Sequence, residues 1–126
     1  MKDVGMTAET DRLLVMRPEP ARMQTYRLAP ERIVGTSPEF VSWDIEQTAD
    51  GKISAGFWEA TPGAWRTSKD GEWEFCHLIS GVVEVTETGK APVRLQAGDS
   101  FVMRPGFSGV WHVIETVRKS FVIYAA

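Results

Sequence analysis

Short alternations of apolar and polar residues dominate the chain from residue 41 onward. The segment 41–46 (VSWDIE) alternates with a period of two, which is typical of a strand that buries one face. Further apolar runs follow, separated by Gly or Pro turns at intervals of about 8–12 residues, as in sandwiches and barrels. No segment combines a 3.6-residue apolar period with capping residues, so few helices are expected. The expected further strands cover 53–61, 65–67, 73–79, 82–86, 93–95, 101–103, 109–115 and 117–124.

Residues 1–40 follow a different pattern. They hold four of the seven prolines and only short apolar pieces, and they are too few to form a core of their own. We therefore divide the chain into an N-terminal arm, 1–40, and a barrel domain, 41–126. The arm is expected to carry one or two short strands, which pack over the barrel or on a partner subunit.

Composition narrows the class of protein. The chain has 126 residues and a formal net charge of -3, which argues against binding to nucleic acid or an anionic membrane. No apolar run approaches the roughly 20 residues of a membrane span, and the first residues lack the apolar stretch of a secretory signal. A single cysteine leaves no disulfide to form within the chain. We expect a cytoplasmic protein.

Two blocks of sequence carry a family resemblance. Residues 74–81 (EFCHLISG) resemble the end of the first motif of the cupin superfamily, and residues 98–106 (GDSFVMRPG) resemble the opening of the second. Segments 56–65 (GFWEATPGAW), 105–111 (PGFSGVW) and 117–121 (VRKSF) resemble the small cupins related to (S)-ureidoglycine aminohydrolase. The resemblance implies an all-β fold, a single cupin (jelly-roll) barrel with a pocket at one end.

The resemblance also bears on metal binding. Metal-binding cupins supply two His, one Glu and a further His; here 67–70 read Thr, Ser, Lys and Asp, and Gly109 stands at the last position. Only Glu74 is retained. Strand alternation places the chain's two histidines, His77 and His112, on the outer face. We expect no metal cofactor; the alternative is Mn, Fe, Ni or Zn held by Glu74, Cys76 and a register-shifted histidine.

Glu74 is the candidate catalytic residue. A carboxyl buried without a metal should have a raised pKa and could act as a general acid or base. The alternative is a carboxylate that is hydrogen-bonded to a neighbour such as a Trp N–H or Lys119. Cys76 shares the inner face with Glu74, either as a reactive thiol or as an inert core residue.

The candidate ligand contacts are aromatic and basic side chains that alternation or motif position assigns to the pocket. Indole rings offer flat area and one N–H donor, which suits a small-molecule site. If Lys119 faces inward, it shares a face with Phe121 and Ile123 and could pair with Glu74 or with a substrate carboxylate. The predicted ligand-binding residues are Trp65, Arg66, Cys76, Phe101, Trp111 and Lys119.

These residues suggest a cupin that binds a small polar metabolite. The resemblance implies ureide or related nitrogen metabolism, with hydrolase or lyase chemistry. The alternatives are a non-catalytic ligand-binding or structural module and a metalloenzyme with the atypical ligand set. Apolar neighbours such as Leu78-Ile79 and Val122-Ile123 place apolar residues on both strand faces, so we also expect a homodimer, with residues 10–40 reaching the neighbouring subunit.

Overall fold

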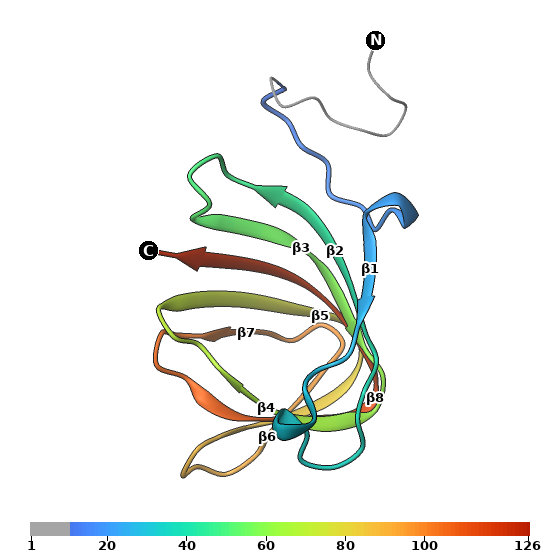
Figure 1. Cartoon of the computed structure of the whole chain (residues 1–126), viewed down its shortest axis with the longest axis vertical. Coiled ribbons are helices and arrows are strands. Elements are labelled where there is room, and N and C mark those ends of the chain that lie inside the picture. Colours follow the sequence, from blue (N-terminus) through green and yellow to red (C-terminus); the bar gives the residue numbers. More distant parts are fainter. Residues whose placement is uncertain (1–10) are drawn as a thin grey trace.

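The structure, a computed structural model, describes residues 11–126, so the first ten residues of the predicted arm lie outside it. Secondary structure in the described part is almost entirely β, which confirms the predicted all-β class (Figure 1). Two single-turn 3-10 segments, η1 and η2, lie in the arm, and neither is long and apolar enough to cross a membrane. In chain order, the elements are η1 (Pro20–Arg22), β1 (Met23–Tyr26), η2 (Pro30–Arg32), β2 (Phe40–Gln47), β3 (Ile53–Ala60), β4 (Gly63–Ser68), β5 (Glu72–Glu87), β6 (Val93–Gln96), β7 (Ser100–Met103) and β8 (Ser108–Ala125).

Two long antiparallel strands, β5 and β8, form the framework of the barrel. They pair along their whole length, from Glu72 opposite Ala125 to Glu87 opposite Gly109. The C-terminal part of β8 also pairs with β3, and its N-terminal part pairs with β4. Strands β7 and β6 pair with the first and second parts of β5. The sheet therefore curves around one interior, as Figure 1 shows.

At two points where the sequence predicted the end of a strand, the structure has a β-bulge inside a longer strand. The expected strands stop short of Gly81 and of Thr116, but each of these residues lies inside one of the long strands. The β5–β8 register shifts several times between Leu78 and Val83. Gly81 has a φ of +92°, and a Cβ there would lie 2.2 Å from the carbonyl oxygen of Thr116. The glycine thus bends the pair where a side chain would not fit.

The arm completes the chain's own sheet. Strand β1 pairs antiparallel with β2, with Tyr26 opposite Phe40. Beyond η2, Ile33 forms a β-bridge with Trp65 of β4. The arm therefore packs on β2 and β4 of its own chain. The sequence analysis had left open whether it packs over its own barrel or on a partner subunit.

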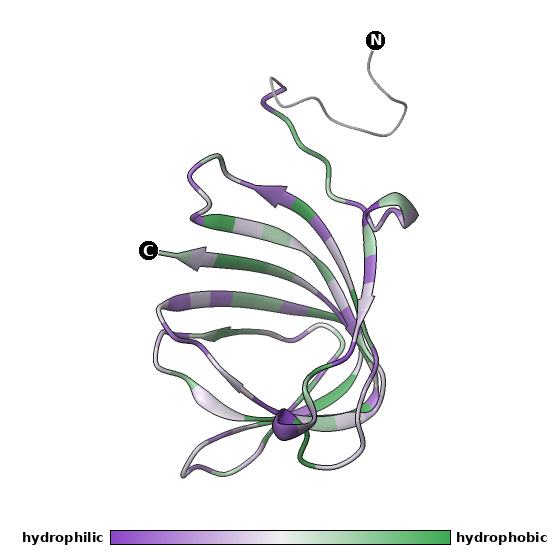
Figure 2. Cartoon of the chain, viewed as in Figure 1, coloured by the Kyte–Doolittle hydropathy of each residue, from purple (hydrophilic) through white to green (hydrophobic). Residues whose placement is uncertain are grey.

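The two faces of the strands differ as alternation predicts. On β5, Glu74, Cys76 and Leu78 are buried, whereas His77, between Cys76 and Leu78, is only partly buried. The outer face is not uniformly polar, and Figure 2 shows hydrophobic stretches along the strands. Paired positions on β8, β7 and β3 expose large apolar side chains there, namely Val122, Tyr124, Val102 and Ile53.

The close approach at Gly81 predicts an unequal response of two glycines to the same substitution. Gly89 also has a positive φ (+82°), but nothing lies within 4 Å of its added Cβ. Gly89→Ala should lower the free energy of unfolding by about 1–2 kcal/mol, because of backbone strain alone. Gly81→Ala should lower it by about 1–3 kcal/mol more, because β5 and β8 must separate. Urea denaturation measures both, and equal losses would contradict this account of the bulge.

The homodimer remains a prediction, and the apolar outer face is where we expect it to form. Light scattering coupled to gel filtration should give the mass of two chains. Val122→Lys should lower that mass toward one chain, because it places a charge in an apolar contact. Val93→Lys, at an exposed valine of β6, should leave the mass unchanged. A wild-type mass of one chain would overturn the prediction.

Candidate functional site

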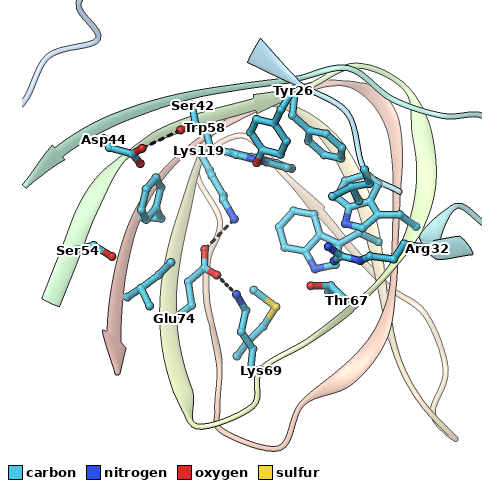
Figure 3. Close-up of a pocket in the computed structure, with 17 residues that line it drawn as sticks. Tyr26, Arg32, Ser42, Asp44, Ser54, Trp58, Thr67, Lys69, Glu74 and Lys119 are labelled. Atoms are coloured by element: carbon cyan, nitrogen blue, oxygen red, sulfur yellow. Dashed lines mark hydrogen bonds and ion pairs between the residues drawn. The ribbon is translucent and has the colours of Figure 1, made fainter. Parts of the chain in front are cut away.

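A cavity of about 350 Å³ opens into the barrel interior, a volume within the range of small-molecule sites. Three groups of side chains line it (Figure 3). One group is charged, one is aromatic and comes from the barrel strands, and one comes from the arm. Members of these groups are Lys69, Glu74 and Lys119; Trp58, Trp65 and Trp111; and Tyr26, Leu28 and Arg32.

The charged group is a carboxylate held between two ammonium ions. Oε1 of Glu74 lies 2.5 Å from Nζ of Lys69, and Oε2 accepts a hydrogen bond from Nζ of Lys119 at 2.8 Å. The three side chains come from separate places: β5, the segment after β4, and β8. Figure 3 shows the two lysines approaching Glu74 from opposite sides.

Glu74 is ionised, which corrects the expected raised pKa. Burial raises the pKa of this carboxyl, but Lys119 and Lys69 together outweigh burial and lower it to about 2. A carboxylate with that pKa is a weak base near neutral pH. Both of its oxygens are also engaged. The geometry therefore favours Glu74 as the anchor of two lysines rather than as a general acid or base.

Lys119 faces inward, as considered in the sequence analysis. Its Nζ lies 4.4 Å from the ring centroid of Trp58 and 4.7 Å from that of Trp111, in addition to its bond with Glu74. Burial opposes its charge, but its interactions with Cys76 and Glu74 outweigh burial and raise the pKa of the ammonium. Cation–π contacts to the two indoles add to its stabilisation.

Cys76 lies behind Glu74 and does not line the cavity. It is fully buried, and its Sγ donates to Oε2 of Glu74 at 3.2 Å. Burial raises the pKa of the thiol to about 12, so the thiolate needed by a nucleophile is not formed near neutral pH. The inert alternative from the sequence analysis fits this geometry.

The aromatic wall is a continuous cluster. The ring centroids of Trp58, Trp65 and Trp111 lie 5.6–5.9 Å apart, at the distances of favourable ring pairs. Nε1 of Trp58 donates to the hydroxyl of Tyr26 at 2.9 Å, which ties the wall to the arm. Nε1 of Trp111 is buried and has no hydrogen-bond partner among the described residues.

Of the residues predicted from the sequence, the structure places Glu74, Trp65, Trp111 and Lys119 around the cavity. Arg66 points away, because it follows Trp65 directly and successive residues of a strand face opposite sides. Its side chain is exposed and donates to the carbonyl of Glu31. Cys76 belongs to the packed core, Phe101 packs against that core, and neither lines the cavity. The ring centroids of Phe101 and Trp111 lie 5.7 Å apart, with the rings tilted by 50°.

Several lining residues escaped the sequence analysis. Thr67 and Lys69 stand two and four positions after Trp65, so strand alternation places them on the same inward face. Alternation could therefore have identified them as lining residues. Pairing with the segment 105–107 continues past the end of β4 and extends the alternation to Lys69, whose N–H donates to Phe107 O at 2.8 Å. The arm residues Tyr26 and Arg32 carried no comparable signal, because their place depends on how the arm folds back.

The residues present do not fit the metal that the fold family implies. Both oxygens of Glu74 accept N–H donors, and a Cβ at Gly109 would lie 2.2 Å from the carbonyl oxygen of Thr86. His77 and His112 lie on the outer face, as predicted; His112 is exposed, His77 is partly buried, and neither lines the cavity. Across residues 11–126, no three His, Cys, Asp or Glu side chains gather where they could hold a metal ion.

The low pKa of Glu74 predicts a specific acid sensitivity. On folding the pKa falls from 4.5 to about 2, so the stabilisation is present above pH 4.5 and is lost as the pH falls toward 2. This loss should be of the order of 3 kcal/mol. Glu74→Gln should unfold more easily at neutral pH and should lose this part of the pH dependence. Glu46→Gln, which removes an exposed carboxylate of β2, should keep the wild-type profile in urea denaturation between pH 2 and 6. Parallel profiles for wild type and Glu74→Gln would contradict the ion-pair account.

Comparisons with known proteins agree on the fold. The structure is similar to a protein of unknown function from Pseudomonas syringae pv. tomato, with a TM-score of 0.70 and 20% identity over 90% of this chain and 46% of that one. It is also similar to the EutQ protein of Clostridium difficile (TM-score 0.61, 18% identity, 71% of this chain and 64% of that one). Ectoine synthase from P. lautus gives a TM-score of 0.63 with 16% identity, over 68% of this chain and 64% of that one. The chain thus spans less than two thirds of each of these proteins.

Among curated proteins, nothing matches the sequence. The family model of the EutQ-like cupin domain matches residues 47–121, which is more than half of the chain and includes β5, most of β8 and the whole charged cluster. The chain therefore belongs to the family of EutQ-like cupin domains.

Proposed function

We propose that this cupin binds a small metabolite in the cavity, with the aromatic wall on one side and the charged cluster on the other. The observation that carries the proposal is the cavity itself, which combines three indoles with two ammonium groups in a volume of about 350 Å³. Apolar walls with a few fixed polar groups are typical of small-molecule sites. The engaged carboxylate of Glu74 favours binding over acid–base catalysis.

Ureides form the first group of compounds to test as ligands. This choice rests on the resemblance to the (S)-ureidoglycine aminohydrolase-like subgroup, while the family match supports the broader EutQ-like cupin class. Ammonia release from a ureide, abolished by Glu74→Gln, would identify an enzyme and overturn the non-catalytic proposal. Tight binding of a ureide without turnover would support it.

Binding should raise the melting temperature and change tryptophan fluorescence, because a ligand that binds only the folded state stabilises it. A metabolite library screened by thermal shift should yield ligands for the wild-type protein. Thr67→Phe places a large ring in the cavity and should remove the shift. Arg66→Gln, at the next residue on the opposite face, should retain it. A ligand-induced shift that survives Thr67→Phe would place the binding site elsewhere.

A further inference from the structure

The charged group of Lys69, Glu74 and Lys119, here called the floor of the pocket, carries one more positive than negative charge. Lys69 and Lys119 share the single carboxylate of Glu74, and the three side chains are only 12%, 8% and 4% exposed. A further carboxylate, that of Glu72, lies 4.0 Å from Nζ of Lys69 but is 43% exposed. An uncompensated charge away from water is unfavourable. The floor therefore favours an incoming anion.

The two lysines are not equally available to a ligand. The ammonium of Lys119 is enclosed by Glu74 and by the faces of Trp58 and Trp111. The ammonium of Lys69 has one close partner, Oε1 of Glu74, and it lines the cavity. Because an ammonium has three N–H donors, Lys69 keeps donors for a ligand.

Two other groups around the cavity, Trp111 and Arg32, bear N–H donors. Nε1 of Trp111 is a buried donor that has no acceptor within residues 11–126. Arg32 brings a third positive charge to the wall and uses its Nε and Nη2 on the carbonyl of Arg66, at 3.2 and 3.0 Å. Asp44 also lines the cavity; its carboxylate is exposed and accepts a hydrogen bond from Ser42. The ammonium of Lys69 and the indole N–H of Trp111 thus offer donors for which a ligand would supply the acceptor.

Building on the ligand-binding function proposed above, we propose that the pocket selects a small monocarboxylate. Its carboxylate binds the free donors of Lys69, and its apolar part lies against the indoles of Trp65 and Trp111. A single negative charge matches the excess of one positive charge at the floor. A phosphate ester would bring about two negative charges and would leave the floor with an excess of negative charge. The cavity of about 350 Å³ limits the ligand to a small metabolite.

Benzoate and benzamide test the proposal, because they have nearly the same shape and differ in charge. Ligand-observed NMR titrations of the full chain should show benzoate binding about tenfold more tightly than benzamide. Lys69→Met leaves Glu74 and Lys119 as a neutral pair, and the preference should fall to about onefold. Lys69→Arg restores the charge and should restore the preference. Lys52→Met, at an exposed lysine outside the pocket, should behave as wild type.

Each outcome bears on a different claim. Equal binding of the two probes, or tighter binding of benzamide, would overturn anion selection while leaving a ligand pocket in place. A preference for benzoate that survives in folded Lys69→Met would overturn the assignment to Lys69. Failure of both probes to bind would overturn the monocarboxylate site. The metabolite screen with Thr67→Phe decides separately whether the cavity binds any ligand.

Discussion

The interior of this barrel depends on one buried carboxylate shared by two ammonium groups. Each of these charges would be unfavourable alone at its depth, and the cluster is stable because the three lie within hydrogen-bond distance of one another. That distance requires β5, β8 and the segment after β4 to keep a fixed register. The pocket's shape, its charge and the low pKa of Glu74 all follow from this arrangement.

The cluster also changes what the fold can do chemically. In a barrel with histidines at these positions, an exchangeable metal could neutralise the glutamate. Here the chain supplies the positive charge from its own Lys69 and Lys119, and the carboxylate has no free oxygen to coordinate an ion. The lysines thus take over the neutralisation of Glu74 that a metal ion would provide. The residues that remain open to the cavity are suited to ligand recognition.

Sequence reasoning worked where strand alternation applies and failed where the chain folds back on itself. Alternation and turn residues were sufficient for the all-β class. Together with the family resemblance they also indicated the inward direction of Glu74 and Trp111, whereas they left the direction of Lys119 open. The same rule, applied consistently, would have excluded Arg66. The sign of the pKa shift of Glu74 was wrong because sequence spacing does not show how close Lys119 of β8 and Lys69 of the segment after β4 come to this carboxylate. The bulges at Gly81 and near Thr116 were interpreted as breaks between strands, since a glycine or a change in alternation is compatible with a bulge or with a strand end.

The pocket is lined by two separate parts of the chain, the arm and the barrel domain. The charged floor lies within residues 47–121, the part that matches the family, whereas Tyr26, Leu28 and Arg32 form a roof from outside that range. Charge recognition and the size or shape of the accepted molecule are therefore encoded in separate stretches of the chain. Substitutions in the roof would change ligand specificity while the charged floor stays intact. A fragment limited to residues 47–121 would keep the charged floor but leave the site open on the side of the arm.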